Sequence, residues 1–100
     1  MKYMHTGIPL SAKLEGMMYA APLKVWIKNE PTYQIEFLYF EKASPMAGAI
    51  QNQTHVAYDV ENIDQAMEGK DVLWPKFDLG DAYIGFVMDK DVVVEFYQKK

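Results

Sequence analysis

One short pattern occurs twice in this chain of 100 residues, and it restricts the folds that the chain can adopt. In each half, a histidine lies in a short apolar segment and a glutamate follows inside a strongly apolar one. These residues are His5 and Glu36 in the first half, and His55 and Glu95 in the second. Self-similarity at a period of roughly fifty residues indicates duplicated supersecondary units. Two histidines and two carboxylates at equivalent points of two such units can converge on one metal ion.

The first half, residues 1–41, is expected to form a β-α-β-β unit that is short of one strand. Residues 11–21 are predicted to be a weak helix, interrupted by Gly16 and stopped by Pro22. The strands are predicted from continuous or alternating apolar residues, and they cover 2–10, 23–28 and 33–41.

The second half, residues 54–100, has clearer boundaries, and residues 42–53 are expected to link the two units. Asn62 is predicted to cap a helix that ends near Gly69, because Gln65 follows Asn62 in the capping-box pattern. The strands of this half are predicted at 54–60, at 72–76 as an edge strand that contains Pro75, and at 82–88 and 92–98 as a hairpin.

Together these elements predict an α+β fold in a single domain, residues 1–100. Two tandem units of βαβββ type would form a curved mixed sheet around a shared cavity, with the first unit shortened. The small residues Gly7 and Ala57 follow the two histidines by two positions, on the same strand face, so each would leave room beside an imidazole.

Composition narrows the possible chemistry and partners. The chain has no cysteine, so a metal site would need nitrogen and oxygen ligands. The net charge of −4 argues against binding to nucleic acid or to an anionic membrane. No signal-like or membrane-spanning apolar run is apparent, so the expectation is a cytoplasmic protein.

Two βαβββ-type units, each with a histidine on its first strand and a glutamate on its last, resemble the vicinal oxygen chelate superfamily. This superfamily contains glyoxalase, bleomycin-resistance proteins, fosfomycin-resistance enzymes and extradiol dioxygenases. The resemblance extends over essentially the whole chain and is best in HVAYDVENIDQAMEG (55–69) and FVMDKDVVVEFYQ (86–98). Three features depart from the superfamily: the chain is short, its first helix is stunted, and Asp89-Lys90-Asp91 replaces the usual glycine of the last hairpin.

The resemblance implies a divalent metal bound by His5, Glu36, His55 and Glu95, as in glyoxalase-like members; dioxygenase-like members use only three of the four positions. It further implies a glyoxalase-like, metal-dependent lyase or isomerase whose substrate chelates the metal through two adjacent oxygens. Glu95 is the preferred catalytic base and Glu36 the alternative. The ligand set suits Zn²⁺, Ni²⁺, Co²⁺, Mn²⁺ or Fe²⁺ without selecting among them.

Other interpretations remain open at this point. A non-catalytic, bleomycin-resistance-like protein would bind a planar ligand through Trp26, Trp74 and Tyr83 while the four polar residues bound nothing. A small sensory or interaction domain is the third possibility. Taken singly, each glutamate is more simply explained by a sheet edge or a lysine partner, and each histidine by strand packing. A homodimer is expected, since two-fold dimers are the commonest assembly.

All ten basic residues are lysines, and the absence of arginine bears on the substrate. Only arginine offers the planar fork that recognises a carboxylate through two bonds. Lys24, Lys28 or Lys76 would have to hold the carboxylates of a glutathione hemithioacetal. We therefore predict low activity on methylglyoxal–glutathione, and a smaller or more apolar vicinal-oxygen compound as the true ligand.

Overall fold

The computed structural model describes residues 1–100 as one eight-stranded mixed sheet with two short α-helices and one 3-10 turn, in agreement with the predicted α+β class. None of the helices has the length and apolar character needed to span a lipid bilayer. The strands are β1 (Lys2–Pro9), β2 (Met18–Ala20), β3 (Val25–Glu30), β4 (Ile35–Phe40), β5 (His55–Asp59), β6 (Asp71–Asp78), β7 (Ala82–Asp89) and β8 (Val92–Lys99).

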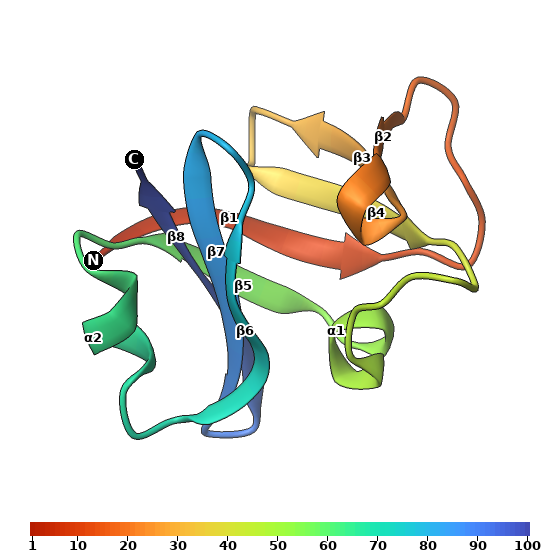
Figure 1. The fold of residues 1–100 in the computed structure, drawn as a ribbon. Helices are drawn as coiled ribbons and strands as arrows, with labels where there is room; N and C mark the ends of the chain where they lie inside the picture. Colours follow the sequence, from red (N-terminus) through yellow and green to blue (C-terminus); the bar gives the residue numbers. More distant parts are fainter.

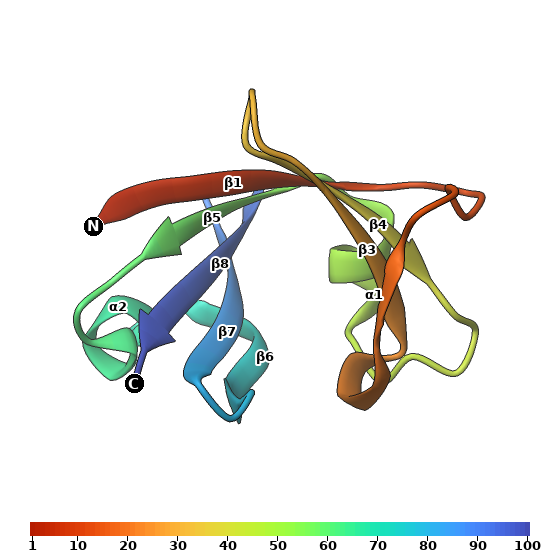
Figure 2. The same ribbon diagram turned by 90° about the horizontal axis from the view of Figure 1, so that it is seen from above.

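The sheet has the strand order β2-β3-β4-β1-β5-β8-β7-β6 and curls into a half-barrel (Figure 1). The central strands β1 and β5 are antiparallel to each other. β1 pairs in parallel with β4, and β5 pairs in parallel with β8, while the remaining pairs are antiparallel. Seen from above, β1 lies at the top of an arch whose two sides are the outer strands of each half (Figure 2). The concave face of this arch holds the candidate site.

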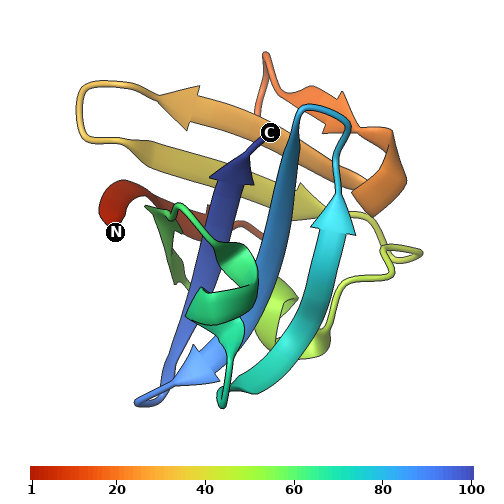
Figure 3. The ribbon, with the colours of Figure 1, turned by 60° about the vertical axis from the view of Figure 1, so that its left-hand side comes forward.

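The core is divided between the two faces of the sheet. On the concave face, α1 (Gly48–Asn52) buries Ile50 fully in a cluster that joins side chains of β3, β4, β7 and β8. On the convex face, α2 (Ile63–Met67) packs Ile63 and Met67 against Val87 and Phe96 (Figure 3). Residues 42–53, expected to be a linker, therefore contain a helix that contributes to the core.

The weak helix predicted at 11–21 is wrong. Residues 11–17 form turns and bends, Met18–Ala20 is the edge strand β2, and Ala21–Leu23 is the 3-10 turn. Gly16 adopts φ +84°, a left-handed conformation that ends any helix. Met18–Ala20 pair with β3 instead, so sheet pairing overrides a weak local preference for helix. β2 is also the strand that the first half was expected to lack.

The second half follows its prediction closely. The Asn62 side chain accepts a hydrogen bond from the backbone N–H of Gln65 at 3.0 Å, which caps α2 as predicted. β6, which contains Pro75, is an edge strand, also as predicted. In the last hairpin, Lys90 and Asp91 both adopt positive φ, at 51° and 63°. A two-residue turn with this backbone matches the twist of its strands even without glycine.

Candidate metal centre

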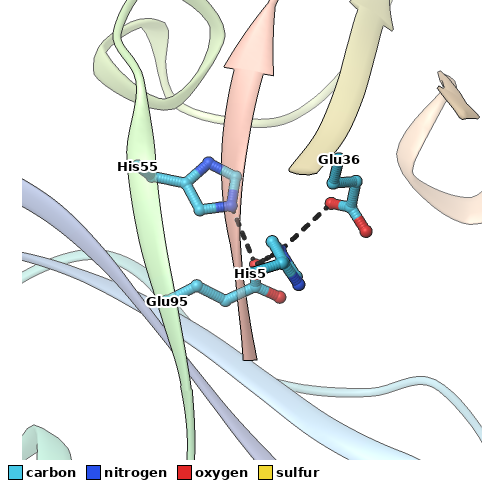
Figure 4. Close-up of side chains that lie close together, drawn as sticks. All are labelled: His5, Glu36, His55 and Glu95. Carbon is cyan, nitrogen blue, oxygen red and sulfur yellow. Dashed lines mark hydrogen bonds and ion pairs between the residues drawn. The ribbon is translucent and has the colours of Figure 1, made fainter. Parts of the chain in front are cut away.

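The four predicted site residues lie on the four central strands of the sheet, one on each strand. Glu36 lies on β4, His5 on β1, His55 on β5 and Glu95 on β8, and all four side chains meet on the concave face (Figure 4). Neither glutamate lies at a sheet edge, and both contact histidines rather than lysines. A position at a sheet edge and pairing with a lysine, the simpler explanations of the two carboxylates, are therefore both excluded.

The register of the central strands explains why a small residue accompanies each histidine. In one row across the sheet, Gly7 lies between Glu36 and His55. In a second row, Ala57 lies between His5 and Glu95. Each small residue therefore makes room for the histidine of the other half, not for the histidine of its own strand as the sequence suggested.

The space beside Gly7 has no room for a side chain on that residue. A Cβ atom at Gly7 would collide with Cε1 of His55 and would lie 2.5 Å from its Nε2. The imidazole of His55 thus rests directly on the backbone of β1, where no side chain is possible. Alanine suffices at position 57, where its side chain is fully buried.

The four side chains are in mutual contact. Nε2 of His55 lies 3.0 Å from Oε1 of Glu95 and hydrogen-bonds with it. Nε2 of His5 lies 3.3 Å from Oε1 of Glu36 and 3.4 Å from Oε1 of Glu95. Neither contact of His5 is aligned as a hydrogen bond, so this buried nitrogen points into the cluster without a hydrogen-bond partner.

The electrostatics of the cluster favour opposite charges on its members. Burial lowers the pKa of His5, but pairing with Glu36 and Glu95 outweighs this and raises the pKa to about 10. Burial raises the pKa of Glu95, but pairing with His5 and His55 lowers it well below the ordinary value. In the metal-free protein, a positive charge on His5 and a negative charge on Glu95 thus stabilise each other.

The donor set fits a divalent metal ion. One nitrogen or oxygen atom from each residue lies within 4.8 Å of all the others. An ion with bonds of about 2.0–2.2 Å needs neighbouring ligand atoms about 3 Å apart, close to the separations observed here. Two neutral imidazoles and two carboxylates would also neutralise its charge. His5, Glu36, His55 and Glu95 could therefore hold such an ion with little rearrangement.

The cluster forms one end of a cavity of about 330 Å³ lined mainly by apolar side chains. Met46 and Ile50, from the predicted linker, contribute to this lining, and sequence analysis missed them. Trp26, Trp74 and Tyr83 do not line the cavity, although they were the predicted contacts for a planar ligand.

Comparisons with known proteins bear on the fold alone. No protein-family model matches the chain, and no curated protein matches it. Among solved structures, the chain is similar to hypothetical protein BH1468 from Bacillus halodurans C-125, with a TM-score of 0.70 and 23% identity, covering 99% of this chain and 94% of that one. An NAD-dependent benzaldehyde dehydrogenase from Legionella pneumophila matches more weakly, with a TM-score of 0.46 and 9% identity, over 77% of this chain and 73% of that one. The first similarity shows a shared fold, and the second is too weak to support a conclusion about the fold.

Proposed function

We propose that this protein binds a divalent metal ion through His5, Glu36, His55 and Glu95 and acts as a glyoxalase-like lyase or isomerase on a small compound with two neighbouring oxygens. The main support is the convergence of the four ligand atoms within 4.8 Å at the end of a cavity large enough for a small molecule. A further support is Nε2 of His5, which is buried without a hydrogen-bond partner. Buried polar atoms are rarely left unpaired, and coordination would satisfy this one.

The strand order supports the proposed origin from two tandem units. Starting from the central pair, the first half has the order β1-β4-β3-β2 and the second half has the order β5-β8-β7-β6. Each half has one parallel pair, next to the centre, and two antiparallel pairs. We infer that the halves are duplicated units with a shared cavity, as the resemblance to the vicinal oxygen chelate superfamily implies.

The contacts of the two glutamates suggest different roles. A bound divalent ion would supply Lewis acidity toward the oxygens of the substrate. Oε1 of Glu95 contacts both histidines, so this carboxylate is the more constrained of the two. Glu36 contacts only His5, and its side chain is more exposed, at 19% against 10% for Glu95. We therefore favour Glu36, rather than Glu95 as preferred from the sequence, as the group that accepts a proton from the substrate, and Glu95 becomes the alternative.

The experiment that tests the proposal is reconstitution of the purified protein with Zn²⁺, Ni²⁺ and Mn²⁺, followed by dialysis and elemental analysis. We expect about one ion per chain. The metal-loaded protein is then screened against small hydroxyketones and dicarbonyls, with Glu36→Gln and Glu95→Gln as variants. If the wild-type protein retains none of the three metals, the proposed site is wrong.

Ligand binding without turnover is the second candidate function, and the apolar lining of the cavity favours it. Of the 18 lining residues, 13 are hydrophobic, so the cavity can stabilise an apolar molecule even where no reaction follows. A ligand that raises the melting temperature of the metal-free protein without being converted would support this candidate.

We also propose a homodimer as the assembly. The convex face of β1–β4 has no helix over it, whereas α2 covers the equivalent face of β5–β8 (Figure 3). A second subunit could cover exposed side chains on this face, such as Tyr19, which pairs with Trp26. Light scattering that shows a monomer at micromolar concentration would overturn this assembly.

A further inference from the structure

The cavity beside the metal centre contains no lysine. Its 18 lining residues include the four members of the cluster, Asn29 and 13 hydrophobic side chains. The chain has no arginine, and all ten of its lysines lie outside this lining. The only group in the cavity that can carry a positive charge is therefore a histidine of the cluster itself.

The lysines that sequence analysis considered for substrate recognition have other positions. Lys28 donates a hydrogen bond from Nζ to the backbone carbonyl of Glu15 at 3.1 Å. Lys76 forms an ion pair with Asp64 at 3.1 Å and lies over the ring of Tyr83. Lys24 is exposed at the end of the 3-10 turn. None of the three reaches the cavity lining.

The charge balance of the centre adds to this argument. The charge of a divalent ion is cancelled by the carboxylates of Glu36 and Glu95, so no net positive charge would remain for an anionic substrate. Moving an unpaired anion from water into an apolar cavity is costly, whereas an uncharged apolar group gains by burial.

Resting on the proposed function, we infer that the substrate is an uncharged small molecule, with two neighbouring oxygens at one end and an apolar body at the other. The oxygens face the cluster, and the body packs against side chains such as Leu38, Ile84 and Phe86. The volume of about 330 Å³ is near the lower limit for ligand pockets, which restricts the size of that body. A glutathione hemithioacetal, with two carboxylates, is disfavoured for the same reasons.

A matched pair of probes tests the inference. 2-Hydroxyacetophenone and mandelate both carry a phenyl ring and two adjacent oxygen functions, but only mandelate is an anion. Binding is followed by the shifts of backbone amide NMR signals of lining residues, in Zn²⁺-loaded protein and in protein kept metal-free with a chelator. We expect 2-hydroxyacetophenone to bind more tightly by at least about tenfold in the loaded protein. The neutral probe should also be preferred in the metal-free protein.

Two lysine variants locate the cause of this preference. Leu79 lies in the cavity lining and is 41% exposed, whereas Val72 lies outside the lining and is 46% exposed. Leu79→Lys places an ammonium group beside the cavity and should reduce the preference for the neutral probe. Val72→Lys makes the same change of net charge elsewhere and should leave the preference unchanged.

The results separate this inference from the proposed function. Equal binding of the two probes, tighter binding of mandelate, or binding of neither probe to the wild-type protein would overturn the inference. An equal effect of both lysine variants would overturn its link to the cavity. Failure to retain any metal would instead contradict the proposed function, and the comparison of probes in metal-free protein would still decide whether the cavity selects uncharged molecules.

Discussion

The two halves of the sheet share one strand order but stabilise their convex faces differently. In the second half, α2 covers β7 and β8 and buries Ile63 fully, with Met67 almost so. In the first half, the corresponding connection, residues 10–17, forms no helix (Figure 1). The second half therefore relies on apolar burial where the first half must use other contacts.

In the first half, polar and aromatic contacts near the surface connect β2, β3 and the segments beside them. The hydroxyl of Tyr19 donates a hydrogen bond to Glu41 at 2.7 Å, and Nε1 of Trp26 lies 3.4 Å from the other oxygen of that carboxylate. The ammonium group of Lys13 lies 3.9 Å from the centre of the Trp26 ring. Exposed contacts of this kind are individually weak.

The same contrast extends to the four residues of the candidate metal centre. The side chains of His55 and Glu95, from the second half, are 2% and 10% exposed, and they share a 3.0 Å hydrogen bond. Those of His5 and Glu36, from the first half, are 16% and 19% exposed, and they lie 3.3 Å apart. The side chains of the second-half pair are therefore more buried and closer together than those of the first-half pair, which are more open to the surroundings.

Removal of a single proposed ligand should have the largest effect on metal affinity. We expect Glu95→Ala and His5→Ala to weaken Zn²⁺ binding by more than about 100-fold, because loss of a group that merely orients a ligand already costs about 10- to 100-fold. Far-UV circular dichroism should remain largely unchanged. Competition with a chelator measures the affinity. Glu36→Ala is the matched variant in the first half, and it should weaken Zn²⁺ binding less than Glu95→Ala does. A larger loss of Zn²⁺ affinity from Glu36→Ala would contradict the greater importance assigned to the second half.

Gly7→Ala should have the next largest effect on metal affinity. Gly7 belongs to the first half, but the substitution displaces His55 of the second half. The new Cβ atom would collide with the imidazole of His55, which must move out of the cluster. We expect metal affinity to fall by about tenfold or more and the metal-free protein to lose about 1–3 kcal/mol of stability.

Gly48→Ala is the matched control for this change. A Cβ atom at Gly48 meets nothing closer than 3.9 Å, and this glycine is in the first turn of α1. Its replacement should leave metal binding unchanged and leave stability equal or slightly higher. Equal loss of metal from both variants would show that the contact of Gly7 with His55 is unimportant.

The second half was more predictable than the first for a physical reason. A cap such as Asn62 and the buried stripe of α2 are local signals, and they determine the structure near them. The strand β2 depends on pairing with β3, which no local pattern records. The four site residues were named from the repeat. The cross-strand role of Gly7 was not foreseen, because it depends on the register of β1 against β5.

The pH dependence of metal binding provides a third test, centred on His5. With an ordinary histidine pKa, metal affinity would stop rising above about pH 6.5. Pairing with Glu36 and Glu95 raises the pKa of His5 to about 10, so a metal ion must displace a proton at neutral pH. Affinity should therefore keep rising above pH 7, by up to about tenfold per pH unit, with about one proton released per ion.

Calorimetric titration with Zn²⁺ in buffers of different ionisation enthalpy measures this proton release. An affinity that is constant between about pH 7 and pH 8.5 would contradict the prediction. Without metal, the stabilisation from protonated His5 should be complete below its unfolded pKa of 6.5 and should be lost as pH rises through about 10. His5→Asn should remove both effects.

The smallest effects are expected from one substitution in each half, Asn62→Ala and Glu41→Ala, and they concern stability. Asn62→Ala removes the cap of α2 and should cost about 1 kcal/mol, which lowers the melting temperature of a domain of this size by about 4–8 °C. Glu41→Ala removes the carboxylate shared by Tyr19 and Trp26, and it should lower the melting temperature less, because these contacts are exposed. It should nevertheless change Trp26 fluorescence, which Asn62→Ala should not. A loss of stability from Glu41→Ala as large as that from Asn62→Ala would mean that the polar contacts of the first half stabilise the fold as firmly as α2 stabilises the second.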